Sequence, residues 1–128
     1  MQVLYAEDDL EDLETFCEVL SKIDASARCV HARNGLDVLE ILETTSELPD
    51  YIFLDINMPV MDGRACLREI KKDQRFTSIP VVIYTTSNNP QDKALCMELG
   101  ATAYIIKPNG INEAIKNLSV FFKKDLSV

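Results

Sequence analysis

The sequence contains little of what zinc-binding or nucleic-acid-binding proteins need. It has a single histidine, and its four cysteines are far apart and form no C-x-x-C pair. These counts argue against a zinc site and favour free thiols in a reducing compartment. Basic residues are outnumbered by acidic ones, 13 against 21, which gives a formal net charge of −8. A chain of that charge repels phosphate backbones, so we expect no direct DNA binding.

Long apolar stretches are also missing. No run approaches the roughly 18 residues of a membrane-spanning helix. The amino terminus lacks the basic segment and apolar run of an export signal. We therefore expect no membrane insertion and a cytoplasmic location. The 128 residues, 47% of them hydrophobic and 27% charged, have the size and composition of one globular domain. No repeat or linker-like tract divides them, so we predict a single domain over residues 1–128.

Five short apolar runs recur along the chain. We predict a strand in each of them: Val3–Ala6, Arg28–His31, Tyr51–Leu54, Val81–Tyr84 and Ala103–Ile106. Four of the five are nearly continuous in apolar residues, which is typical of parallel strands that are covered on both faces.

The segments between these runs have helical periodicity. Apolar residues recur at the spacing i, i+3, i+4, i+7, as in the set Leu13, Phe16, Cys17 and Leu20. Asp62 and Gly63 can begin the third helix, Asn89 with Pro90 the fourth, and Gly100 can end it. The alternation predicts an α/β domain, a doubly wound five-stranded parallel sheet with five helices on its two faces.

Ligands of such sheets bind beyond the carboxyl ends of the strands. The polar residues that follow the predicted strands are Glu7, Asp8, Asp9, Asp55, Thr85 and Lys107. Carboxylates that lie a few ångströms apart repel each other, and Lys107 offers only one positive charge against them. Mg²⁺, which prefers oxygen ligands, would close that deficit. A divalent ion, an ammonium and a hydroxyl together favour phosphoryl transfer, and a carboxylate among them can become an aspartyl phosphate.

Longer motifs at these positions carry a family likeness. They are A-E-D-D at 6–9, L-D-I-N-M-P-V-M-D-G at 54–63, Y-T-T-S at 84–87, G-A at 100–101 and I-K-P at 106–108. In this order they closely resemble the receiver (response regulator) domain of two-component signalling, and the run D-x-x-M-P-x-M-D-G is the most specific of them. The likeness covers essentially the whole chain and is strongest to a stand-alone receiver. It implies a flavodoxin-like fold with strand order 2-1-3-4-5.

The resemblance also implies roles for single residues. Asp55 would be the phosphoacceptor, supplied by a histidine kinase or a histidine phosphotransfer protein. Asp8, Asp55 and the backbone carbonyl of Asn57 would bind Mg²⁺, and Glu7 would act on the ion through water. The protein would catalyse only its own phosphorylation and dephosphorylation, and would signal to a downstream protein target.

The remaining implied roles concern switching. Thr85 would hydrogen-bond the phosphoryl group, and Lys107 would pair with that group or with the carboxylate. Tyr104 occupies the switch-aromatic position, and Pro108 would follow a cis peptide bond. Asn57 and Ser87 match positions that tune dephosphorylation.

Two questions stay open at this stage. Three consecutive acids follow the first strand, so the metal pair is either Glu7 with Asp8 or Asp8 with Asp9, and we prefer the former. The apolar residues Val120, Phe121 and Phe122 either fold onto the domain or form an exposed patch for a partner or a second copy of the chain.

Two other functions compete with a phosphorylated receiver. A phosphatase of the haloacid dehalogenase type needs a second aspartate two positions after the nucleophile, where this chain has Asn57. A degenerate receiver would bind partners without phosphorylation, and the complete set of site residues argues against it.

Overall fold

The computed structural model describes the backbone of residues 1–126 and the side chains of residues 1–123. Five parallel strands form one sheet in the order β2-β1-β3-β4-β5. The strands are β1 (Gln2–Ala6), β2 (Arg28–Ala32), β3 (Tyr51–Leu54), β4 (Val81–Thr85) and β5 (Ala103–Ile106). The predicted fold and strand order are confirmed, and every predicted strand agrees with the observed one to within a residue.

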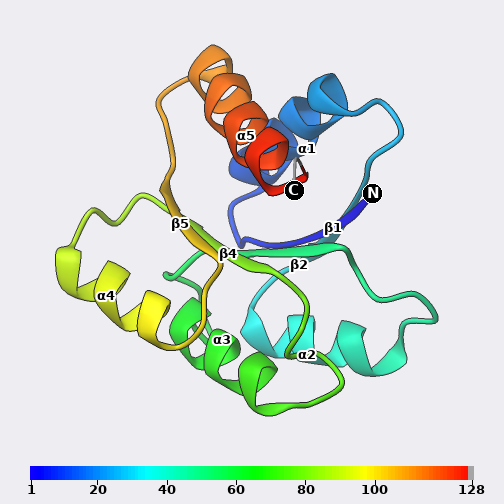
Figure 1. The fold of residues 1–128 in the computed structure, drawn as a ribbon, viewed down its shortest axis with the longest axis vertical. Coiled ribbons are helices and arrows are strands. Elements are labelled where there is room, and N and C mark those ends of the chain that lie inside the picture. The colour runs from blue at the N-terminus through cyan, green and yellow to red at the C-terminus, as the bar shows by residue number, and fades with distance from the viewer. Residues whose placement is uncertain (127–128) are drawn as a thin grey trace.

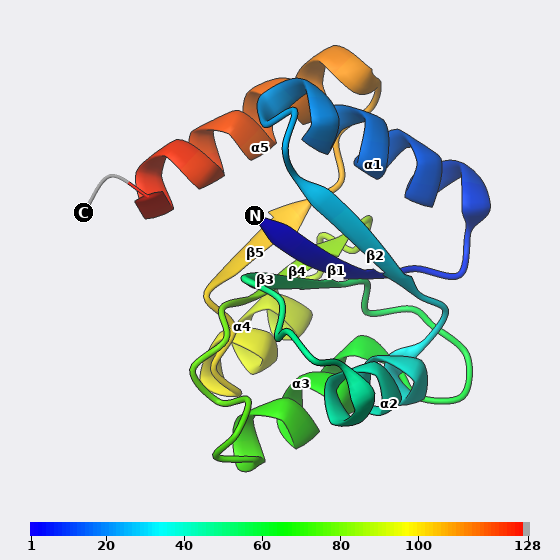
Figure 2. The same cartoon turned by 90° about the vertical axis from the view of Figure 1, so that its right-hand side faces the viewer.

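Five helices alternate with the strands and cover both faces of the sheet (Figure 1). Helices α1 (Leu10–Ile23) and α5 (Ile111–Leu126) lie on one face. Helices α2 (Gly35–Thr44), α3 (Gly63–Lys72) and α4 (Pro90–Glu98) lie on the other, as the turned view shows (Figure 2). Because each strand is followed by a helix that crosses back, all strands run the same way and their carboxyl ends share one edge.

The two faces of the sheet bury different kinds of side chain. Successive strand residues point to opposite faces, so Leu4 and Ala6 contribute to the α2–α3–α4 side whereas Val3 and Tyr5 contribute to the α1–α5 side. The first side is mostly aliphatic, and the second is rich in aromatic rings. Because both faces of the sheet are buried, the strand sequences are unbroken runs of apolar residues.

The last helix folds back onto the sheet. Phe122 is buried, and the rings of Phe121 and Phe122 both contact those of Tyr51 and Phe53. Val120 alone of the three apolar residues is exposed. Of the two arrangements considered for this segment, the structure therefore favours packing onto the domain, because aromatic contacts with β3 bury Phe122 and partly cover Phe121.

Polar side chains begin the first four helices. Asp9, Asn34, Asp62 and Asn89 each accept a hydrogen bond from a backbone N–H of the helix that follows. Such caps satisfy amide groups that have no partner inside the helix. The caps predicted at Asp62 and Asn89 are confirmed, and Gly100, with φ of +106°, follows α4 as expected.

Gly63 lets α3 start directly behind the end of β3. Its N–H donates to the carbonyl oxygen of Ile56 at 2.9 Å and closes the loop between the two elements. A Cβ atom at this position would overlap the backbone carbonyl of Asp55 and lie 2.9 Å from the Cα atom of Ile56. The D-G pair is therefore more than a helix start, because its glycine allows the backbone around Asp55 to be packed closely.

We predict that Gly63→Ala lowers the free energy of unfolding by about 2 to 3 kcal/mol, since the added methyl group displaces backbone and not a flexible side chain. Urea denaturation measures this. Gly110→Ala is the matched control, because a Cβ there meets nothing within 4 Å and only the positive φ of 89° is strained, at about 1 kcal/mol. Equal losses in the two variants would contradict the close-packing argument.

Candidate functional site

The polar residues predicted to follow the strands gather at one edge of the sheet. Lys107, which follows β5, is the centre of the group. Its Nζ atom donates to Glu7 Oε2 at 2.5 Å, to Asp55 Oδ2 at 2.7 Å and to Asp12 Oδ2 at 3.0 Å. An ammonium has three N–H donors, so these three carboxylates engage all of them.

Glu7 and Asp55 are both buried at this edge. Glu7 follows β1 and accepts from the backbone N–H of Asp9 at 3.1 Å and from the hydroxyl of Tyr5 at 3.4 Å. Asp55 follows β3, and its Oδ1 atom accepts from the N–H of Asn57 at 3.1 Å. Each of these two carboxylates is therefore held in place by a backbone N–H of its own loop and by Lys107. Because both are buried, these hydrogen bonds replace the water that would otherwise solvate their charges.

The two acids that share the Lys107 ammonium have pKa values shifted in opposite directions. Burial, reinforced by the neighbouring Asp55 carboxyl, raises the pKa of Glu7 to about 7 against the opposing effect of Lys107. Burial alone would raise the pKa of Asp55, but hydrogen bonding with Glu7 and Lys107 outweighs it and lowers that pKa below its ordinary value. Of the two acids, Asp55 is thus the one whose ionised form is favoured.

The lysine itself stays charged. Burial would lower the pKa of Lys107, but the hydrogen bonds to Asp55, Glu7 and Asp12 raise it above its ordinary value. A permanently positive group therefore lies beside the carboxylate of Asp55.

The three acids after β1 have three different surroundings. Glu7 turns inward to Lys107, Asp8 is exposed, and Asp9 caps α1 by accepting from the N–H of Glu11 at 2.9 Å. The structure therefore brings Glu7, and not Asp9, to the lysine that contacts Asp55. Which of the two pairs would bind a metal ion stays a prediction.

Thr85 lies at the end of β4, next to the start of the β5–α5 connection. It is fully buried; its Oγ1 atom accepts from the N–H of Ser87 at 3.3 Å, and its carbonyl oxygen accepts from the N–H of Lys107 at 2.7 Å. The hydroxyl of Tyr104 donates to the carbonyl oxygen of Ser87 at 2.9 Å. The threonine and the tyrosine are therefore both tied to the loop after β4.

One prediction about this edge is wrong. Within residues 1–126 all peptide bonds are trans, including the bond between Lys107 and Pro108. The trans form of a bond to proline is favoured by about 0.5 to 1 kcal/mol unless the fold imposes the other. Here the chain changes direction two residues later, at Gly110 with φ of +89°, so the connection to α5 is made without a cis bond.

Sequence reasoning missed two residues of the site. The first is Asp12, and the signal for its position is its place four residues before the buried Phe16, on the inward stripe of α1. The second is His31, whose Nε2 atom lies 2.7 Å from the backbone oxygen of Glu7. A carbonyl oxygen only accepts, so this nitrogen is the donor and steadies the Glu7 backbone.

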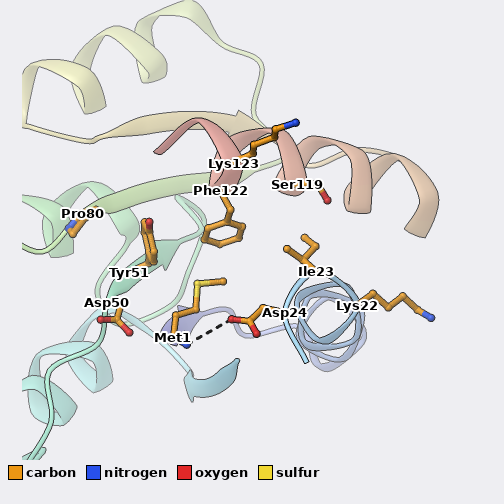
Figure 3. A pocket seen from close by; sticks show the side chains of 10 residues that line it. All are labelled: Met1, Lys22, Ile23, Asp24, Asp50, Tyr51, Pro80, Ser119, Phe122 and Lys123. Carbon is orange, nitrogen blue, oxygen red and sulfur yellow. Dashed lines mark ion pairs between the residues drawn. The ribbon is translucent and has the colours of Figure 1, made fainter. Parts of the chain in front are cut away.

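A large hollow with a mostly apolar lining lies away from this edge. It has a volume of about 870 Å³, lies at the opposite end of the strands and is lined by Met1, Asp24, Tyr51 and Phe122, among others (Figure 3). Its one ion pair joins the amino terminus to Asp24 at 3.7 Å. None of the strand-end residues reaches it, so volume does not identify the functional site here.

The side chains at this edge do not by themselves form a prearranged metal site. In the part of the chain that the structure describes, no group of three or more histidine, cysteine, aspartate or glutamate side chains is arranged to hold a metal ion. Likewise, no helix within residues 1–126 is long and apolar enough to cross a membrane.

A 2-1-3-4-5 parallel sheet with an acid pair, a buried threonine and a lysine at its carboxyl edge defines a class of α/β signalling domain. The family model described as "Response regulator receiver domain" matches residues 3–119. The chain belongs to this family and is a receiver domain of two-component signalling.

Similar proteins agree with this assignment. The chain is 33% identical over 119 residues to "Response regulator Rcp1" of Synechocystis sp., which covers 89% of this chain and 81% of that protein. A crystal structure of the Mn²⁺-bound form of response regulator Rcp1 has a TM-score of 0.85 at 31% identity, covering 95% of this chain and 91% of that one. The phosphorylated cyanobacterial phytochrome response regulator RcpA has a TM-score of 0.88 at 28% identity, with the same coverage.

Other curated relatives are much longer proteins. The chain spans only 10% to 19% of the next ones that it matches. The activities of those longer proteins outside their receiver segments are not assigned to this chain.

We predict that Lys107→Met raises the pKa of Asp55 by about one to three units, because the buried carboxylate loses its nearest positive charge. The ¹³C shift of the Asp55 carboxyl carbon, followed by NMR against pH in metal-free buffer, measures this. Lys71→Met is the control, since that lysine is also partly buried but donates to the carbonyl oxygens of Thr77 and Ile79. An unchanged Asp55 titration in Lys107→Met would show that the lysine does not set its charge.

Proposed function

We propose that this receiver accepts a phosphoryl group on Asp55 and thereby switches its binding to a protein target. The observation that carries the proposal is the convergence of Lys107 on Asp55 and Glu7 at the carboxyl edge of the sheet. An ionised carboxylate beside a buried cation is a suitable nucleophile, since the cation can also stabilise the incoming phosphoryl oxygens.

The donor set supports a Mg²⁺ site at the same edge. Asp8 and Asp55 offer carboxylate oxygens, Asn57 offers a backbone carbonyl, and Glu7 lies behind them to act through water. Mg²⁺ commonly binds one or two carboxylates and keeps several waters, so three preassembled side chains are not required. When bound, the ion would supply positive charge that offsets the acids and the phosphoryl group.

The transfer step then follows from the residues around Asp55. One carboxylate oxygen of Asp55 forms a bond to phosphorus while the bond from phosphorus to the donor's histidine nitrogen breaks. The electron pair of that bond stays on the histidine nitrogen, which takes up a proton, and Asp55 becomes a neutral acyl group that carries the negatively charged phosphoryl group. Lys107 remains beside this charge, and Thr85 can turn its hydroxyl toward it. Hydrolysis by water returns Asp55 to the free carboxylate.

Switching would use the loop after β4. In the present structure the Thr85 hydroxyl accepts from the N–H of Ser87, and the carbonyl oxygen of Ser87 accepts from the hydroxyl of Tyr104. Drawing Thr85 toward a phosphoryl oxygen would disturb both bonds and bias the position of this loop and of α4. The surface around Tyr104 would then differ between the two states, which is what a partner needs to distinguish them.

The partners follow from this chemistry. The donor would be a histidine kinase or a histidine phosphotransfer protein, and the output a protein contact without DNA. A donor that draws its phosphoryl group from ATP places the exchange in the cytoplasm, where the four unpaired cysteines would also stay reduced. We treat residues 1–128 as one receiver domain, supported by the single sheet that all the helices cover. Pairing with a second copy stays a prediction.

We predict that Asp55→Asn abolishes labelling by acetyl phosphate in the presence of Mg²⁺, because the amide is not a nucleophile. Intact-protein mass spectrometry detects the added phosphoryl mass. Asp62→Asn is the matched control, since it alters an aspartate of the same loop whose side chain caps α3 and pairs with Arg64 at 3.5 Å but does not contact Lys107, and it should label normally. Chelation of Mg²⁺ by EDTA should prevent labelling of the wild type. Full labelling of Asp55→Asn at another residue would overturn the assignment.

A further inference from the structure

Asp12 is the member of the Lys107 cluster to which the proposed reaction assigns no task. It lies in the first turn of α1, and its Oδ2 atom accepts from Lys107 Nζ at 3.0 Å, the longest of the three contacts. Glu7 and Asp55 also accept from neighbouring backbone amides, whereas the Asp12 side chain is hydrogen-bonded only to Lys107 among the described residues. The contact joins α1 to the connection between β5 and α5.

The three carboxylates differ in how unfavourable it is for each to lose its contact with Lys107. The side chain of Asp12 is 45% exposed, but those of Glu7 and Asp55 are 3% and 10% exposed. A buried carboxylate that loses its cation is left poorly solvated, which is strongly unfavourable. A half-exposed carboxylate is rehydrated at little cost. Asp12 is therefore the partner that Lys107 can release most easily.

Phosphorylation requires such a release, if Asp55 is the phosphoacceptor as proposed above. The Asp55 carboxylate then loses its charge on forming the acyl phosphate, and the incoming phosphoryl group places new negative charge further out, where the ammonium has to meet it. All three of its N–H donors are already engaged by carboxylates. The Lys107 ammonium therefore exchanges an existing carboxylate contact for each phosphoryl contact that it makes.

We propose that Asp12 is a positioning residue that competes with the phosphoryl group for Lys107. In the unphosphorylated state it holds the ammonium toward α1, and in the phosphorylated state it gives the ammonium up and turns to water. Asp12 thus stabilises the unphosphorylated state selectively, and it weakens the affinity of the site for a phosphoryl group without touching that group.

The test uses beryllofluoride, a non-covalent mimic of the phosphoryl group, with the full-length chain at saturating Mg²⁺. We expect Asp12→Asn to bind it about three- to fivefold more tightly than the wild type, as follows from losing a half-exposed ion pair that favours only the free state. Asp12→Ala should shift the affinity in the same direction. Titration followed by ¹⁹F NMR measures the affinity.

Glu11→Gln is the matched control. It removes the same charge from the same turn of α1, but its side chain is exposed and makes no ion pair with Lys107 among the described residues. A general effect of charge on an anionic ligand would act in both variants, whereas competition for Lys107 acts in Asp12→Asn alone. Equal affinities in Asp12→Asn and Glu11→Gln would overturn the proposal.

The two proposals fail in different ways. If the wild type binds no beryllofluoride, or if Asp55→Asn binds it equally well, the assignment of Asp55 fails. If the wild type binds it in a manner that depends on Asp55, but Asp12→Asn binds no more tightly than the wild type, only the role of Asp12 fails. Affinity for Mg²⁺ alone, measured in the same variants, separates a change at the metal site from a change at Lys107.

Discussion

The site depends on one buried cation among several carboxylates. Lys107 is nearly inaccessible to water, and its ammonium is the shared partner of Glu7, Asp12 and Asp55. Without it, two buried acids would lie close together with no charge to offset them. With it, Asp55 remains ionised while Glu7 titrates near neutrality. The same ammonium thus keeps the Asp55 carboxylate charged and links three segments of the chain at this edge.

The parallel sheet is what makes this meeting of distant residues possible. Glu7, Asp55 and Lys107 are separated by about fifty residues from one to the next, yet each directly follows a strand. Parallel strands end at one edge, so three residues that come after different strands become neighbours. The backbone has to be packed closely at the same place, and Gly63 provides for this by leaving room behind Asp55. The fold therefore determines the site, because packing on both faces of the sheet sets the distances between the charged side chains.

Most of the fold and the main part of the site follow from local patterns. Unbroken apolar runs, helical periodicity and cap residues such as Asp62 and Asn89 act over a few residues, and all of them agree with the structure. Other features could not be predicted in this way. Phe121 and Phe122 are apolar in either arrangement of the last helix, and only the position of Tyr51 and Phe53 decides that they are covered. The isomer of the bond before Pro108 depends in the same way on where the following turn is made.

The alternation of strands and helices, the nature of the edge residues and the class of protein were determined by the sequence, because alternating periodicities and short motifs are local properties. The strand order followed only from the family resemblance. The tertiary structure alone decided which acids share Lys107. Asp9 and Asp12 are both acids beside the first helix, yet one caps it and the other points at the lysine. His31 likewise acquires its contact with Glu7 only through the pairing of β1 with β2. The physical reason is that the partner of a charge depends on distances of a few ångströms between segments far apart in the chain, and no spacing along the sequence encodes those distances.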